Sequence, residues 1–189
     1  NVQIGHNVVI HHGTVVGDNV TIQDGVNLGK SNFETLGTGS SKKMLEGFLP
    51  LEIESNVLIA TGALCYAGTK IGFGSIIADH AIVREGCDIG HNVKIGKKAI
   101  IEYEVVLEEG VSIQAFVLVG EKMRVGEGAF MGPHVSTACD TNMSSTSEEE
   151  LDIPSIGPGV KVGVNTTILP GIEIGKNSII GGGSVVSRN

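Results

Sequence analysis

The sequence predicts an all-β protein, a single-stranded parallel β-helix built from six-residue repeats. An aliphatic residue recurs at every sixth position along most of the 189 residues, and a small or β-branched residue usually follows four positions later. Gly or Asn stands between the two in most repeats, and the chain has no Trp and only five Phe and two Tyr. Self-similarity at a fixed period indicates a solenoid, and a core without large aromatic rings has to be thin and regular.

The period of six runs through three blocks, residues 4–28, 53–131 and 156–186. Neither the 3.6-residue period of an α-helix nor the alternation of a simple strand gives a strict six. Three short strands in each coil, stacked in parallel about 4.8 Å apart, do give it. We therefore expect about eight coils, forming a prism about 40 Å tall.

The positions within each repeat predict which side chains are buried. The aliphatic residue and the small residue four positions later share the interior, which places Cys65 and Cys87 in the core. The residue three positions after the aliphatic one is most often Gly or Asn, which accept a left-handed backbone at little cost. Each repeat is therefore interpreted as a short strand followed by a corner.

Two segments leave the repeat, Phe33–Glu52 and Thr137–Ser155. Both are polar and rich in Gly and Ser or in acidic residues, and the repeat resumes after each. We interpret them as loops extruded from one β-helix domain that spans residues 1–189. Cys139 lies in the second segment, where we expect it to be exposed.

Composition excludes several classes of protein. The net charge is −8 and no run of Lys or Arg occurs, which disfavours nucleic acid and anionic membranes as partners. No apolar stretch approaches the ~18 residues of a membrane span, and no signal peptide is visible after Asn1. Three cysteines without close spacing fit neither a disulfide framework nor a zinc site, so we expect a cytoplasmic protein.

The segment Ile156–Asn189, IGPGVKVGVNTTILPGIEIGKNSIIGGGSVVSRN, resembles the closing coils of hexapeptide-repeat acyltransferases. This resemblance implies a left-handed helix, a homotrimer and coenzyme A as the acyl carrier. The segment Ile77–Asn142 is similar to sugar N-acyltransferases that act on nucleotide-linked amino sugars. It implies acetyl-CoA or another short acyl-CoA as co-substrate, an amino-sugar nucleotide as acceptor and no metal. The chain lacks the tail that usually follows the last repeat, and it has no His-Asp-Cys motif from which to assign a catalytic base.

Candidate site residues come from the corners that depart from Gly and Asn. Because residues 18 apart stack in a helix with three repeats per coil, four of these corners are expected to form one column. We predict that His134 or His80 in this column is the catalytic base and that Lys98 and Phe116 contact the substrate. The two histidines would lie about 14 Å apart, too far to serve one proton. A packing role in a trimer interface remains open for Lys98 and Phe116, and His is itself common in left-handed corners. The seven exceptions are Ser31, His80, Lys98, Glu104, Phe116, Lys122 and His134.

Four further residues complete the predicted site. Asp140 and Asn142, in the loop that follows His134, are candidate partners for the sugar or for a proton. Lys176 and Arg188 in the last coils are candidate ligands of the coenzyme phosphates. Ordinary loop polarity and solubility charge are the alternative interpretations of these four residues.

Other polar residues are predicted to lie on the surface without a role in the site. Arg84 and Glu85 are expected to form a solvent-exposed charge pair on another face. Four histidines occupy outward positions and are interpreted as surface residues: His6, His11, His12 and His91.

Four functions compete at this point. The first is N-acylation of an amino-sugar nucleotide, and the second is O-acetylation of a sugar or small alcohol, which needs a firmer base. The third, a zinc carbonic anhydrase, requires three converging histidines, whereas His80 and His134 are expected far apart. The fourth is a non-catalytic β-helix that acts as an oligomerisation or regulatory module.

Overall fold

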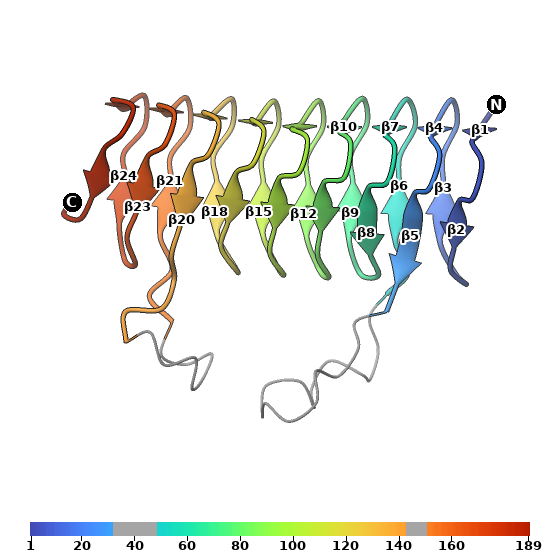
Figure 1. The fold of residues 1–189 in the computed structure, drawn as a ribbon, viewed down its shortest axis with the longest axis horizontal. Helices are drawn as coiled ribbons and strands as arrows, with labels where there is room; N and C mark the ends of the chain where they lie inside the picture. The colour runs from blue at the N-terminus through green and yellow to red at the C-terminus, as the bar shows by residue number, and fades with distance from the viewer. Residues whose placement is uncertain (32–48, 143–150) are drawn as a thin grey trace.

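A computed structural model describes residues 1–31, 49–142 and 151–189. Across these ranges the chain forms strands and turns and no helix, and therefore no helix that could cross a membrane. The strands make three parallel sheets of nine, nine and eight strands, which form the three faces of one elongated prism (Figure 1). The parallel β-helix is confirmed, with nearly nine coils where about eight were expected, and the arrangement is consistent with the left-handed form.

Every strand pairs with the strand three places later in the chain, so each coil adds one strand to each sheet. We name the sheets A, B and C in the order in which the chain visits them. Sheet A contains β1 (Gln3–Ile4), β4 (Thr21–Ile22), β7 (Leu58–Ile59), β10 (Ile76–Ile77), β13 (Lys94–Ile95), β16 (Ser112–Ile113), β19 (Phe130–Met131), β22 (Lys161–Val162) and β25 (Ile179–Ile180).

Sheets B and C follow the same rule. Sheet B contains β2 (Val9–Ile10), β5 (Asn27–Lys30), β8 (Leu64–Tyr66), β11 (Ile82–Val83), β14 (Ile100–Ile101), β17 (Leu118–Val119), β20 (Ser136–Thr137), β23 (Thr167–Ile168) and β26 (Val185–Val186). Sheet C contains β3 (Val15–Val16), β6 (Glu52–Ile53), β9 (Lys70–Ile71), β12 (Asp88–Ile89), β15 (Val106–Leu107), β18 (Arg124–Val125), β21 (Ser155–Ile156) and β24 (Glu173–Ile174).

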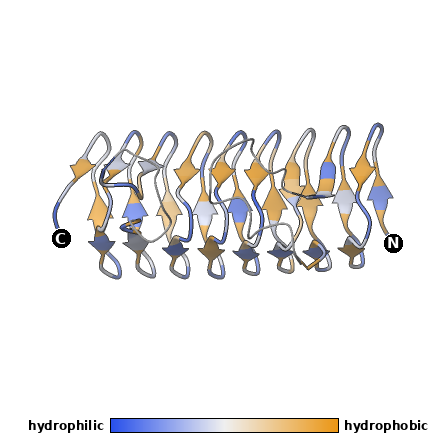
Figure 2. Ribbon diagram, turned by 90° about the horizontal axis from the view of Figure 1, so that it is seen from below, coloured by the Kyte–Doolittle hydropathy of each residue, from blue (hydrophilic) through white to orange (hydrophobic). Residues whose placement is uncertain are grey.

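The core is the column of aliphatic side chains that the period predicts. Ile59, Ile77 and Ile95 lie directly above one another in sheet A with at most 1% of their surface exposed. Cys65 and Cys87 are buried among them, as expected. In Figure 2 one row of strands is mostly orange and the other two rows mix orange, white and blue, while many turns are blue. Burial of these stacked side chains is the main force that holds coil on coil.

The corners are left-handed, as predicted. Their φ angles are positive whether the residue is Gly, Asn or one of the exceptions, with Ser31 not among them. Beyond the first coil, most corner N–H groups donate to a backbone oxygen one coil away, for example from Lys98 to Asp79 over 2.9 Å. Coils approach so closely that a Cβ at Gly96 would lie 2.5 Å from the carbonyl carbon of Gln114. The corner is therefore a repeated structural unit, and the three columns of corners are the edges of the prism.

Both departures from the repeat occur between a strand of sheet B and the next strand of sheet C, on the same side of the prism (Figure 1). Their predicted bounds were partly wrong. Leu51 is fully buried and β6 begins at Glu52, so the coil resumes before residue 53. Thr137 belongs to β20 and pairs with Ile168 of β23, and its hydroxyl accepts from the Gly120 N–H at 2.7 Å and donates to the Leu118 carbonyl at 3.2 Å. Residues 33–48 and 143–150 of the predicted loops lie outside the described residues.

Candidate functional site on the edges of the prism

The predicted column exists and lies on the edge between sheets A and B, the A–B edge. His80, Lys98, Phe116 and His134 occupy successive corners there, with φ angles of 56°, 55°, 60° and 59°. Their backbone N–H groups each donate to the preceding coil, and all four side chains are exposed. A spacing of 18 residues therefore did translate into one stacked column.

Three of the four side chains form a stack. The rings of Phe116 and His134 are parallel within 3° with their centroids 4.9 Å apart. The ammonium of Lys98 lies 5.6 Å from the centroid of the Phe116 ring on the next coil. Such ring and cation–π contacts are worth about 0.5–1 kcal/mol each at an exposed site, enough to favour the stacked orientation of the imidazole.

His80 lies at the other end of the column, against Gly62. A Cβ at Gly62 would collide with the imidazole of His80, so the glycine leaves the space in which that ring lies. Lys98 separates His80 from the Phe116–His134 stack. The two candidate bases thus have different surroundings: His134 stacks on the Phe116 ring, and His80 lies against Gly62.

Asp140 and Asn142 do not lie beside His134 within one chain. β20 continues the helix past His134, and the chain leaves the coil only at the next edge, between sheets B and C. There the Asn142 N–H donates to the Asp140 carboxylate at 2.8 Å, and Asp140 bridges to Leu151. One face of the prism separates these two residues from the histidine.

Lys176 and Arg188 are both exposed but lie on different edges. Lys176 follows β24 on the edge between sheets C and A, and Arg188 follows β26 at the end of the B–C edge. The structure brings neither of them to the A–B column. Their coenzyme-binding role remains a prediction.

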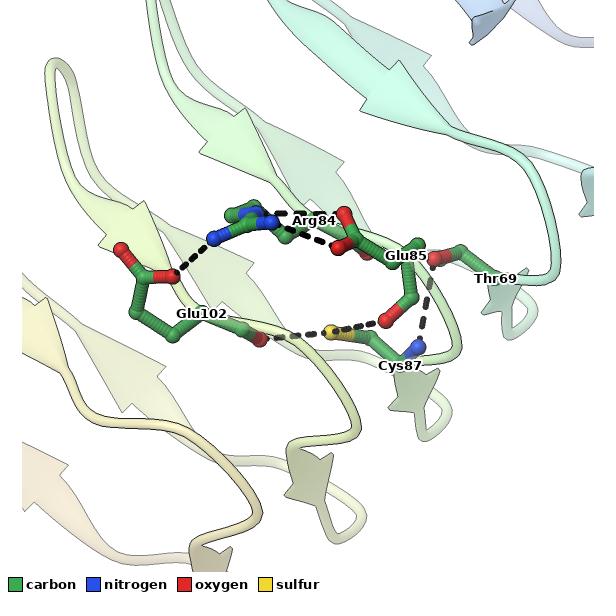
Figure 3. A network of polar contacts seen from close by, with 5 residues as sticks. All are labelled: Thr69, Arg84, Glu85, Cys87 and Glu102. Carbon is green, nitrogen blue, oxygen red and sulfur yellow. Dashed lines mark hydrogen bonds and ion pairs between the residues drawn. The ribbon is translucent and has the colours of Figure 1, made fainter. Parts of the chain in front are cut away.

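The expected exposed pair of Arg84 and Glu85 is wrong, because Glu85 is completely buried. The guanidinium of Arg84 contacts the Glu85 carboxylate at 2.6 Å and the Glu102 carboxylate at 2.8 Å, one coil further on (Figure 3). Burial alone would lower the pKa of Arg84, but the hydrogen bonds and charges of Glu85 and Glu102 raise it above its ordinary value. The spacing of 18 between residues 84 and 102 was a signal for this contact in the sequence.

The same network reaches into the core. The Thr69 hydroxyl donates to the Arg84 carbonyl at 2.7 Å, and the Cys87 thiol donates to the Glu102 carbonyl at 3.0 Å (Figure 3). The ring of Tyr103 lies 5.4 Å from the Arg84 guanidinium carbon. The B–C edge therefore carries a compact set of charged and aromatic groups between the two points where the chain leaves the coil.

Cys139 is also buried, contrary to expectation. It is 4% exposed, and its thiol contacts the Glu121 carbonyl at 3.7 Å beneath the B–C edge. Burial raises the pKa of Cys139 to about 12, so it is a poor nucleophile. Among residues 1–31, 49–142 and 151–189, no three His, Cys, Asp or Glu side chains gather as a metal ion would require.

The sequence profile described as bacterial transferase hexapeptide (six repeats) matches residues 1–30 and 154–188. The matched coils are similar to that repeat. The match covers the first and last coils of the chain and confirms the resemblance drawn from residues 156–189. No curated protein matches the chain.

Solved structures with a similar fold include three acyltransferases or related proteins at low identity. A UDP-N-acetylglucosamine acyltransferase from Campylobacter jejuni is 20% identical, with a TM-score of 0.49, over 92% of this chain and 68% of that one. The corresponding enzyme from Francisella novicida is 19% identical, with a TM-score of 0.48, over 79% and 65%. PerB from Caulobacter crescentus, in complex with CoA and GDP-perosamine, is 22% identical, with a TM-score of 0.41, over 69% and 48%. The chain thus spans between about half and two thirds of the length of these proteins.

Proposed function

We propose that this protein is an acyltransferase that moves an acetyl or other short acyl group from coenzyme A to the amino group of a nucleotide-linked amino sugar. The hexapeptide repeat of bacterial transferases supports the reaction class. The similarity of residues 77–142 to sugar N-acyltransferases supports the acceptor. In this proposal the protein acts as a homotrimer.

The stack of Lys98, Phe116 and His134 is the observation that carries the proposal. The sugar amine attacks the thioester carbonyl, a C–N bond forms, and the C–S bond to coenzyme A breaks. His134 accepts the proton that the nitrogen loses, a contribution of roughly 100- to 10,000-fold in rate. Phe116 holds the imidazole in orientation, and positioning of the two substrates adds to the effect.

The other candidates are assigned by charge. Lys98 would pair with a phosphate of the nucleotide sugar, and His80, at the far end of the column, is the second candidate base. Asp140 and Asn142 would contact the sugar from the B–C edge, which in an assembly belongs to a neighbouring copy. Lys176 and Arg188 would meet the coenzyme phosphates.

Calorimetric titration with acetyl-CoA tests the donor, and release of free coenzyme A in the presence of a panel of amino-sugar nucleotides tests the acceptor. We expect saturable binding at one site per chain and turnover with at least one amino sugar. Sugars in which a hydroxyl replaces the amine should not be acylated. A folded protein that binds no acetyl-CoA would contradict the proposal and favour the non-catalytic module.

A further inference from the structure

Four consecutive coils carry no carboxylate on sheet A or on the A–B edge. Each of their segments runs from a strand of sheet A to the corner that follows it, and the segments are 94–98, 112–116, 130–134 and 161–165. Together they contain four lysines and no Asp or Glu, in a chain whose net charge is −8. Because β13, β16, β19 and β22 pair in register, the segments form one continuous surface. This surface is a positive region of an acidic protein.

Three of these lysines lie close together in the first of the four segments. Lys94 points outward from β13, Lys97 and Lys98 follow on the A–B edge, and all three side chains are exposed. Within the described part of the chain none of the three forms an ion pair, whereas Arg84 and Arg124 do. Like charges this close repel one another, and a bound anion removes that repulsion. Three ammonium groups on flexible stems are therefore suited to a phosphate group.

The neighbouring coil does not neutralise this cluster. The A–B edge has a carboxylate at Asp79, one coil before Lys97, and both side chains are exposed. They form no ion pair with each other in the part of the chain that the structure describes. One carboxylate against three ammonium groups leaves an excess of positive charge at this coil, in the direction of the coils that carry no acid.

The surface changes from basic to aromatic along the prism. The ammonium of Lys98 lies 5.6 Å from the centroid of the Phe116 ring, and that ring stacks on His134 one coil further on. Phe130, on the strand that leads to His134, is 37% exposed. The A–B edge thus presents ammonium groups, then an aromatic ring, then the imidazole of the candidate base. A ligand that lies along this edge has an anionic group at one end and a reacting group at the other.

The separation along the edge distinguishes two molecules that carry a diphosphate. Lys98 lies two coils before His134, about 10 Å for coils stacked about 4.8 Å apart. In a nucleotide sugar only the glycosidic oxygen and part of one pyranose ring separate the diphosphate from a ring amine, which fits this gap. In coenzyme A the whole pantetheine arm separates the diphosphate from the thioester, and the extended arm is longer than the gap. The spacing therefore favours the diphosphate of the acceptor.

We propose that Lys94, Lys97 and Lys98 form a binding site for the diphosphate of the nucleotide-linked acceptor. The sugar is then directed toward His134 and the nucleoside toward the coils that precede Lys94. The anion site itself follows from the charge and exposure of the lysines. Its assignment to the acceptor rests on the proposed function. The site makes the protein selective for sugars that carry a diphosphate over free amino sugars.

Binding of inorganic pyrophosphate tests the anion site without turnover. In calorimetry at low salt, a chain with Lys94→Gln and Lys97→Gln should bind pyrophosphate about tenfold more weakly than the unaltered protein, since two charge-assisted contacts are lost. Lys98 is kept, because its ammonium also contacts Phe116. Lys70→Glu changes the net charge by the same amount on the outer face of sheet C and should leave the affinity within about twofold. Equal affinities in the double variant and the unaltered protein, or no binding by the folded protein, would overturn the proposal.

Steady-state kinetics assign the diphosphate to one of the two substrates. In the Lys94→Gln, Lys97→Gln variant the KM for the amino-sugar nucleotide should rise about tenfold, while kcat and the KM for acetyl-CoA stay within about twofold. The corresponding amino sugar without a diphosphate should be acylated with the same kcat/KM by both proteins. A rise in the KM for acetyl-CoA alone would place the coenzyme at the lysines and overturn the assignment. Lysine-dependent pyrophosphate binding by a protein that acylates no amino sugar would contradict the proposed function and support the anion site.

Discussion

The A–B and C–A edges of the prism have the same backbone and different side chains. On the C–A edge every described corner is Gly or Asn, for example Asn92 and Gly110, which take the left-handed conformation at little cost. On the A–B edge four consecutive corners are His, Lys, Phe and His with the same φ. The fold needs only the left-handed backbone at these corners. The His, Lys and Phe side chains on the A–B edge therefore indicate a role other than folding. The B–C edge resembles the A–B edge in this respect and adds a buried ion pair.

The largest expected difference between the edges is in catalysis. His134→Ala should lower kcat/KM for acyl transfer by roughly 100- to 10,000-fold, because the amine proton loses its acceptor. His91→Ala, an exposed histidine beside Glu54 on the C–A edge, should leave kcat/KM within about twofold. Equal losses in the two variants, or none in His134→Ala, would remove the distinction and exclude His134 as the base.

Thiol labelling tests whether Cys139, beneath the B–C edge, is shielded from solvent. Since burial raises the pKa of Cys139 to about 12, its thiolate fraction at pH 8 should be roughly 1,000-fold below that of an exposed thiol. A maleimide or disulfide reagent should therefore label the native protein very slowly, and faster as the pH rises toward 12. All three cysteines should react at once in guanidinium. Rapid native labelling of Cys139 would show that this edge is open.

The buried ion pair predicts a smaller difference, in stability. Glu85→Gln removes a charge partner of Arg84 and should lower the free energy of unfolding by about 2 kcal/mol, since Glu102 still compensates part of the guanidinium charge. Glu109→Gln on the C–A edge is the matched control and should change it by less than about 0.5 kcal/mol. Urea unfolding followed by circular dichroism measures the free energy of unfolding of both variants. An unchanged value for Glu85→Gln would mean that the ion pair of Arg84 and Glu85 does not contribute to stability.

The smallest effect concerns the corners themselves. Asn92→Lys on the C–A edge should lower the free energy of unfolding by about 1 kcal/mol, because a lysine pays the left-handed strain that asparagine largely avoids. Lys98→Asn should relieve a similar strain on the A–B edge. Thermal melts of both variants at low protein concentration give the comparison. If neither substitution changed the free energy of unfolding, the residue type at a corner would not affect stability. The His, Lys and Phe corners would then need no functional explanation.

Much of the site could be predicted because the repeat converts sequence spacing into position. A distance of 18 residues is one coil within an unbroken block, so the column of His80, Lys98, Phe116 and His134 followed from counting. The same count could have paired Arg84 with Glu102, but charged residues at outward positions were assumed to be solvated. Glu85 is buried because a guanidinium lies over its carboxylate, and no spacing rule reports that.

The sequence by itself determined the period, the core and the left-handed corners, because in a β-helix these depend on local geometry that every repeat restates. Only the tertiary structure decided which edge each residue occupies beyond a break in the repeat. Gly62 stacks on Gly25 across 37 residues and Asn165 on His134 across 31, because the chain that leaves the coil returns at the next strand whatever its length. Asp140, by contrast, comes before the second break, and its place one face away from His134 follows from the six residues between them. Pairing between coils, which the chain makes only once it is folded, fixes the positions that follow each break.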